Sequence, residues 1–176
     1  MLITRAGPPG VFLIDPERFE DGRGFFARTW CPEEFASHGL NPRLAQCSLA
    51  YNRLAGTLRG MHYQAAPHEE AKVVRCTAGA ILDVVVDLRA GSPTRLRWSR
   101  YELTAENRRA LYVPEGFAHG YVTLTDGAEV LYMISEPQAT ASARGFRWDD
   151  PAFGIAWPVD VRVISDRDRL YPDFDG

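Results

Sequence analysis

Glycine and proline recur along this chain at intervals of roughly 8 to 15 residues, and this spacing limits the fold more than any other feature. Short runs rich in Val, Ile, Leu and Tyr lie between them, as in "KVVRC", "AILDVVVDL", "RALYV", "FAHGYVTL" and "EVLYMIS". Such short runs favour strands, whereas a helix needs a longer amphipathic segment. The pattern therefore predicts a mainly β protein, a sandwich or barrel with short peripheral helices.

The segments between the runs predict how the strands connect. "TAG" (77–79) and "TDGA" (125–128) are typical of tight hairpin turns. "CPEEFASHG" (31–39) predicts a helix, because Pro32 suits the first helical position and Gly39 can end it. A second helical turn is expected at "TAENRR" (104–109). The tail carries Trp148, Phe153 and Trp157, so we expect it to wrap against the body.

Composition excludes several classes of function. The chain has 176 residues, which suits one domain with a substantial core. The formal net charge is −3 and the basic residues are scattered, so no nucleic-acid partner is expected. No run approaches membrane-spanning length and the N-terminus lacks the apolar core of a signal peptide, so no membrane association is expected. The three cysteines are widely spaced, which predicts free thiols in a reducing cytoplasm.

Strand alternation predicts a polar interior for the barrel. Because successive side chains point to opposite faces, Lys72, His119 and Tyr132 each share a face with apolar neighbours, and His62 and Gln64 of "RGMHYQ" share one face with Gly60. A small barrel built this way would have a ligand-sized cavity. Its interior would receive His62, Gln64, Lys72, His119 and Tyr132.

Lys72 is also the only lysine among the 20 basic residues. An ammonium group is a compact charge that arginine does not imitate, so a functional role is favoured. Asp83 and Asp87 share a strand face with Val85, and they either join the polar network of the cavity or serve as structural carboxylates.

Two segments resemble the paired motifs of the cupin superfamily, which has a jelly-roll barrel. They are "GTLRGMHYQAAPHEEAKVVRCTAG" (56–79) and "VPEGFAHGYVT" (113–123). Metal-binding cupins have a His-x-His pair where this chain has His62-Tyr63-Gln64, and a Gln carbonyl is a poor ligand for a transition metal. We therefore expect no metal, although a metal-dependent cupin enzyme remains an alternative. A base, an acid and a cation around one cavity suit proton abstraction beside a carbonyl.

Longer motifs make the resemblance specific. The segments "DGRGFF", "GTLRGMHYQ", "KVVRCTAGAILDVVVDLRAGSPT", "LTAENRRALYVPEGFAHGY", "EVLYMIS", "RWDDPAFGIAWP" and "ISDRD" are similar, in order, to the dTDP-4-dehydrorhamnose 3,5-epimerase family. The resemblance covers about residues 20 to 168. It implies a cofactor-independent isomerase that inverts C3 and C5 of dTDP-4-dehydro-6-deoxy-D-glucose on the route to dTDP-L-rhamnose.

The resemblance also implies catalytic roles. His62 resembles the general base, and Asp168 of "SDRD" resembles the carboxylate that orients it. Lys72 matches the residue that faces the C4 oxygen and stabilises the enolate. Tyr132 of "LYM" matches the acid that returns a proton to the opposite face of the sugar.

Five further residues are assigned to substrate binding. Arg59 and Arg23 match residues that contact the diphosphate. Gln46 matches a polar contact on the nucleotide side, and His119 matches a second histidine of the pocket. Gln64 is either a ligand contact or a satisfied core amide.

The resemblance further implies a homodimer in which the N-terminal strands are exchanged, so that Arg23 completes the neighbouring site. We expect a single domain over 1–176. Within it, residues 1–45 would form the exchanged N-terminal strands and helix, 46–136 the jelly-roll barrel, and 137–176 a C-terminal wrap that supplies Asp168.

The chain departs from the family beyond the "LYM" strand. Pro137 and Gln138 stand where the family has an aromatic pair, and a Gln cannot provide a stacking face for the base. Gln46, Cys47 and Ser48 replace a common "QDN" pattern. A 3- or 5-mono-epimerase acting on another nucleotide sugar is therefore an alternative, as is a non-catalytic sugar-nucleotide-binding cupin.

Overall fold

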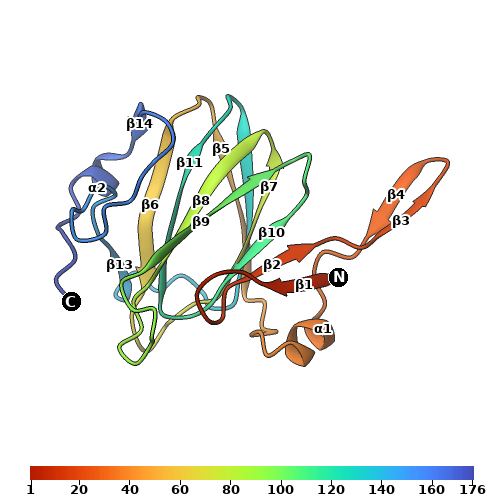
Figure 1. Cartoon of the computed structure of the whole chain (residues 1–176), viewed down its shortest axis with the longest axis horizontal. Helices are drawn as coiled ribbons and strands as arrows, with labels where there is room; N and C mark the ends of the chain where they lie inside the picture. The colour runs from red at the N-terminus through yellow and green to blue at the C-terminus, as the bar shows by residue number, and fades with distance from the viewer.

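The computed structural model describes residues 1–176, and it confirms a mainly β fold with two short helices. Two sheets face each other as a jelly-roll barrel (Figure 1). One sheet has the order β1 (Leu2–Arg5), β2 (Phe12–Asp15), β10 (Ala110–Val113), β7 (Lys72–Ala78), β12 (Ala128–Ile134), β5 (Gln46–Asn52). The other has the order β13 (Ala143–Gly145), β6 (Thr57–Gln64), β11 (Phe117–Thr123), β8 (Ala80–Asp87), β9 (Trp98–Thr104), with β14 (Val163–Ile164) parallel to β6.

The main core lies between the two sheets. The inward faces of the strands alternate as expected, so that Phe117 and Tyr121 of β11 meet Val74 of β7 and Val130 of β12. Removing this apolar surface from water stabilises the barrel at about 25 cal/mol per Å². Polar side chains occupy the same inward faces toward one end, and this end holds the candidate site.

The prediction of hairpins at "TAG" and "TDGA" is wrong. The turn at Gly79 joins β7 to β8, which lie in different sheets, and the turn at Gly127 joins β11 to β12, which also do. Gly79 has φ +70°, and a Cβ there would lie 2.3 Å from Oγ1 of Thr125. These glycines therefore serve chain reversals that cross from one sheet to the other. The segment "TAENRR" likewise forms a turn and not a helix.

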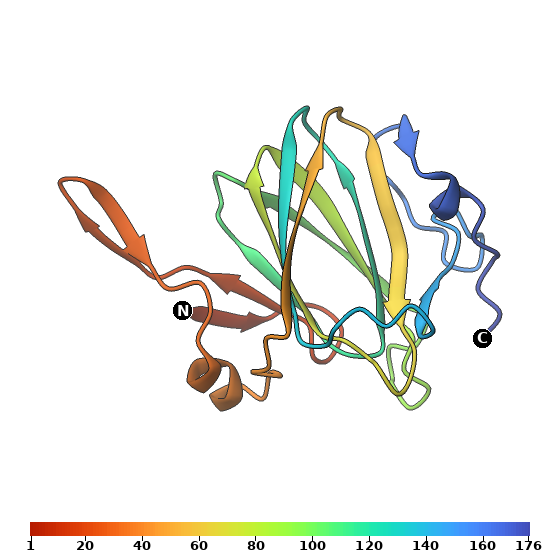
Figure 2. The same ribbon diagram turned by 180° about the vertical axis from the view of Figure 1, so that it is seen from behind.

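The N-terminal segment projects from the barrel. The hairpin of β3 (Arg18–Asp21) and β4 (Gly24–Ala27) extends away from both sheets (Figures 1 and 2), and the guanidinium of Arg108 lies over the ring of its Phe25, 5.0 Å from the centroid. Helix α1 (Pro32–Ser37) follows and buries Phe35 against Tyr112 and Leu40. This confirms the helix predicted from Pro32, and Gly39 has the positive φ of +72° that ends it.

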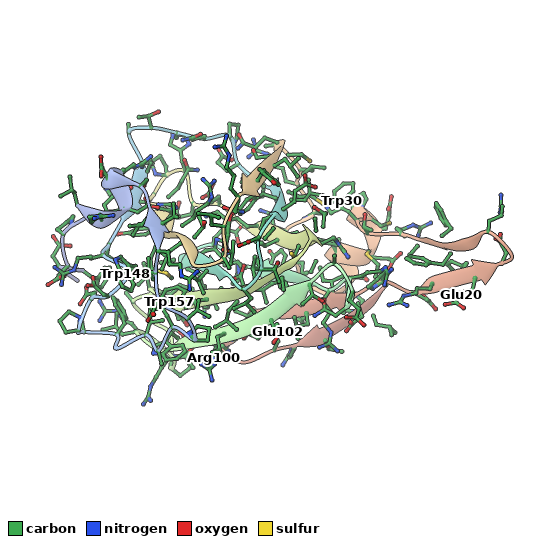
Figure 3. All side chains as sticks on the ribbon, turned by 90° about the horizontal axis from the view of Figure 1, so that it is seen from above. Glu20, Trp30, Arg100, Glu102, Trp148 and Trp157 are labelled. Carbon is green, nitrogen blue, oxygen red and sulfur yellow. The ribbon has the colours of Figure 1, made fainter.

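The C-terminal segment covers the outer face of the second sheet. Phe146 stacks on Phe153 with ring centroids 4.5 Å apart, and Phe174 packs on both rings. The indole N–H of Trp157 donates to the carbonyl of Trp148. Figure 3 shows both tryptophans at the end of the molecule opposite Glu20 of the hairpin. The packing holds the short helix α2 (Asp166–Arg169) against β6.

Neither helix is long and apolar enough to span a bilayer.

Candidate active site

A cavity of about 410 Å³ opens at one end of the barrel between the two sheets. It is lined by eight of the nine residues predicted from the sequence, namely Gln46, Arg59, His62, Gln64, Lys72, His119, Tyr132 and Asp168. The ninth, Arg23, lies at the hairpin and pairs with Asp21, far from the cavity of its own chain.

A bulge in β6 brings two of these residues to the same side. Simple alternation places Arg59 and His62 on opposite faces, but the pairing with β11 shifts register between them. Gly60 lies at this shift with φ +139°, and a Cβ there would lie 2.6 Å from Cα of Gly120. Only glycine fits this crossing of two backbones. The bulge therefore places a guanidinium and an imidazole in one cavity.

His62 and Asp168 form a dyad across 106 residues of sequence. Nε2 of His62 lies 2.7 Å from Oδ1 of Asp168, and the backbone N–H of Gly60 donates to the other carboxylate oxygen at 3.2 Å. Burial raises the pKa of Asp168, but these hydrogen bonds outweigh burial and hold it below its usual value. The carboxylate is thus ionised, and it can stabilise the positive charge that an imidazole gains when it accepts a proton.

Asp168 is positioned by the short helix that carries it. Ser165 caps α2, because its Oγ accepts a hydrogen bond from the backbone N–H of Asp168 at 3.1 Å. The side chain of His62 remains 37% exposed while that of Asp168 is 6% exposed. The ring therefore faces the cavity with its carboxylate behind it, as a general base requires.

A second, fully buried dyad lies beside the first. Nε2 of His119 is 2.8 Å from Oδ2 of Asp83, and His119 is the cross-strand neighbour of His62. Burial raises the pKa of Asp83, and His119 opposes this effect. Asp83 thus joins the polar network of the cavity, whereas Asp87 binds Arg89, Ser92 and Thr94 and is structural.

Tyr132 faces these histidines from the other sheet. Its ring centroid is 6.1 Å from that of His119, and it lies on β12 while both histidines lie on β6 and β11. Burial raises the pKa of Tyr132 well above its usual value, and the neighbouring Tyr121 raises it further. The phenol is therefore protonated at neutral pH and can act as a proton donor.

Lys72 begins β7 and points into the cavity with its ammonium 2.9 Å from Oε1 of Glu70. Both side chains are about one-tenth exposed. Glu70 lines the cavity but was missed from the sequence, because "HEEAK" has the composition of a solvated loop.

The exposed side of the cavity carries arginines without acidic partners. Arg59 donates to Asn52 and to the carbonyl of Tyr51, Arg144 donates to two backbone carbonyls, and Arg167 donates to the Tyr171 hydroxyl. None of the three forms a salt bridge, so their charge is available to an anion. Arg144 and Arg167 were also missed, since no motif marks them.

Glutamines hold the loop that closes one side of the cavity. Oε1 of Gln46 accepts from the backbone N–H of Gln138 at 3.1 Å, and Oε1 of Gln64 accepts from that of Ala139 at 2.6 Å. Gln64 also donates to the carbonyl of His68. Its amide is thus satisfied by backbone groups, which leaves the side chain of Gln138 as the cavity-lining group of the loop.

No three His, Cys, Asp or Glu side chains gather in the arrangement that a metal ion needs. The groups that do gather are a base with its carboxylate, a protonated phenol on the opposite wall and an ammonium. Arginines suited to a phosphate lie at the rim.

Comparison with known proteins finds a family model and relatives that match most of the chain. The family model described as dTDP-4-dehydrorhamnose 3,5-epimerase matches residues 7–176. The enzyme of that name from Sinorhizobium fredii is 41% identical over 163 residues, which are 92% of this chain and 84% of the relative.

Solved structures match over nearly the whole chain. The dTDP-4-dehydrorhamnose 3,5-epimerase of Bacillus anthracis, with TDP and pyrophosphate bound, has a TM-score of 0.94 and 36% identity, and the match covers 98% of this chain and 99% of that one. ChmJ from Streptomyces bikiniensis, a 3'-monoepimerase in complex with dTDP-quinovose, has a TM-score of 0.88 and 36% identity, with 97% and 86% covered.

Proposed function

The chain belongs to the dTDP-4-dehydrorhamnose 3,5-epimerase family, and we propose that it inverts C3, C5 or both in a nucleotide-linked 4-dehydro-6-deoxyhexose. It is a sugar epimerase, an enzyme of the isomerase class. The proposed substrate is dTDP-4-dehydro-6-deoxy-D-glucose, and the product of double inversion is dTDP-4-dehydro-L-rhamnose. The observation that carries the proposal is the His62–Asp168 dyad facing Tyr132 across one cavity.

The reaction begins with proton abstraction. The C4 ketone acidifies the hydrogens on C3 and C5, so one base can serve each carbon in turn. His62 takes the proton, the C–H electron pair moves to the C4 oxygen, and an enolate forms. Asp168 stabilises the imidazolium that results. Lys72 stabilises the negative charge on the C4 oxygen, so no bound cofactor is needed.

Reprotonation from the opposite face completes the inversion. Tyr132 donates its phenolic proton to the carbon, and the electron pair of the enolate forms the new C–H bond while the C4 ketone is restored. His62 and Tyr132 stand on different sheets, which supports attack from one face and delivery from the other. Solvent then exchanges the proton on His62 and restores that on Tyr132.

The nucleotide end of the substrate lies at the exposed side of the cavity. Arg59 contacts the diphosphate, and the unpaired guanidiniums of Arg144 and Arg167 add charge there. His119, Gln46 and Gln64 complete the walls. The exposed position of these arginines leaves the buried end for the sugar, which carries no charge.

A homodimer would supply the last arginine. Phe19 and Phe26 are cross-strand neighbours on the hairpin and are 63% and 74% exposed. Adjacent exposed aromatic rings are typical of a surface that binds another protein chain. Strand β5 is the open edge of its sheet and exposes Leu49 and Tyr51. In the proposed dimer the hairpin packs on the partner, and its Arg23, 90% exposed in one chain, reaches the diphosphate of the neighbouring site.

Mixing two impaired variants tests this exchange. Arg23→Ala is expected to raise KM about tenfold through a lost diphosphate contact, and His62→Asn removes the base. Heterodimers of the two variants have one site with both defects and one intact site, so co-expression restores about a quarter of wild-type activity at low substrate concentration. Each variant mixed with itself is the control. Absence of recovery in isolated heterodimers would show that Arg23 acts within its own chain or not at all.

The choice of nucleotide rests on the loop that follows β12. Gln138 faces the cavity and its backbone is held by Gln46. Without an aromatic face, selection of the base depends on hydrogen bonds from this amide. The similarity to a 3'-monoepimerase supports single inversion as the alternative outcome of the same chemistry. The three cysteines are free, which fits the proposed cytoplasmic location.

A substrate panel tests the function as a whole. The protein is incubated in D₂O with 4-dehydro-6-deoxyhexoses carrying dTDP, CDP, UDP or GDP, and NMR follows deuterium at C3 and C5. We expect deuterium at one or both carbons with inverted product, fastest for dTDP. Exchange at a single carbon selects the mono-epimerase. Exchange at neither carbon with all four nucleotides contradicts the proposed function and leaves the binding-protein alternative.

A further inference from the structure

Each basic side chain on the inner walls of the cavity has a carboxylate partner of its own. His62 pairs with Asp168 at 2.7 Å and His119 pairs with Asp83 at 2.8 Å. The third pair, Lys72 with Glu70 at 2.9 Å, has the same form. The exposed arginines of the cavity have no such partner. The pairing is therefore confined to the part of the cavity proposed to bind the sugar. Glu70 has the same place in its pair as Asp168 and Asp83 have in theirs.

We propose that Glu70 is a positioning residue of the epimerase site, which holds the ammonium of Lys72 aimed at the C4 oxygen. This inference rests on the proposed function, because Lys72 acts on an enolate only if that enolate forms. Glu70 touches Lys72 and not the reacting carbons, so it acts through the lysine.

Burial makes such a partner necessary. A lysine with a tenth of its side chain exposed loses most of its hydration, and a buried charge needs a partner within the protein. A carboxylate at 2.9 Å replaces that hydration. The ammonium has three N–H donors and Glu70 accepts one, which leaves others for the substrate oxygen.

The pair also limits where the ammonium can lie. A lysine side chain has four rotatable bonds, so a lysine without a partner for its ammonium would sample several rotamers. Lys72 begins β7 and Glu70 lies two residues earlier, so the strand fixes one end of the side chain and the carboxylate fixes the other. Stabilisation of a developing oxyanion depends on donors that are in place before the charge appears.

A double-mutant cycle tests the proposal. Glu70→Gln keeps the shape and an acceptor oxygen but removes the charge, and Lys72→Met removes the ammonium. We expect Glu70→Gln to lower kcat for exchange at C3 and C5 by the same factor, about 10- to 100-fold, with KM changed less than about threefold. Glu70→Asp retains the charge and should recover part of the rate. The doubly substituted protein should be no slower than Lys72→Met alone.

Two measurements separate this role from a structural one. The affinity for the nucleoside diphosphate of the best panel substrate should be unchanged in Glu70→Gln, because the exposed arginines bind it. Glu69→Gln is the matched control, since Glu69 is adjacent but exposed, and it should retain wild-type kcat.

Several outcomes would overturn the proposal. Wild-type kcat in Glu70→Gln would do so, as would independent, multiplicative losses in the double variant, or a weakened diphosphate affinity that accounts for the whole loss. A wild-type protein that exchanges neither carbon would instead overturn the proposed function itself.

Discussion

His62→Asn is expected to abolish solvent exchange at both carbons of the sugar, with kcat lowered about 10³-fold or more. Asparagine keeps a polar group near Asp168 but accepts no proton at neutral pH. Because one imidazole faces the cavity with its carboxylate behind it, C3 and C5 should lose exchange together. Deuterium incorporation by NMR measures each carbon separately.

The control for this variant is His38→Asn, which lies exposed at the end of α1 and should leave the rate unchanged. Retained affinity for the nucleoside diphosphate would show that His62→Asn is folded. If one carbon still exchanged at the wild-type rate, a second base would have to serve it, and the assignment of His62 to both carbons would be wrong.

Tyr132→Phe is expected to separate exchange from inversion. The base is intact in this variant, so deuterium should still enter the substrate, returned by His62 to the face from which the proton left. Inverted product should fall about 10²- to 10³-fold, because the opposite wall has lost its donor. NMR detects this as deuterated substrate of unchanged configuration. Inversion at the wild-type rate would contradict the role of the phenol.

The raised pKa of Tyr132 adds a pH dependence to the same experiment. Burial disfavours the phenolate, so the donor stays protonated beyond the usual range of tyrosine. Wild-type kcat should therefore not decline through ionisation of this group up to pH 10. Tyr51→Phe, with its ring 59% exposed on β5, is the matched control and should retain product formation.

Strand alternation was sufficient to predict most of the cavity. His62, Lys72, His119 and Tyr132 all lie on the inward faces that period-two patterning assigned to them. This worked because an inward residue with apolar neighbours at i±2 has little freedom to turn outward. The two "hairpins" failed because turn chemistry depends on backbone angles alone. Gly79 and Gly127 look the same whether the chain returns beside itself or crosses to the facing sheet.

Other features depend on contacts that no local pattern encodes. Alternation alone puts Arg59 on the wrong face, and only the register with β11 reveals the bulge at Gly60. Glu70 lies in a loop, Arg144 on the short strand β13 and Arg167 on the short helix α2, and the composition of these segments suggests solvated surface. Asp168 was assigned from a resemblance between motifs, since nothing within 100 residues of His62 points to it.

The close approach of Gly60 and Gly120 has a consequence for which substrates the site can accept. Arg59 and His62 flank one kink in a single strand, so the backbone fixes the spacing between the residue proposed to contact the diphosphate and the proposed base. Strand β6 thereby sets the distance between the proposed phosphate contact and the sugar carbon that meets the base. The proposed function therefore predicts that a sugar linked to its nucleotide by a longer or shorter group than a diphosphate would present the wrong carbon to the base.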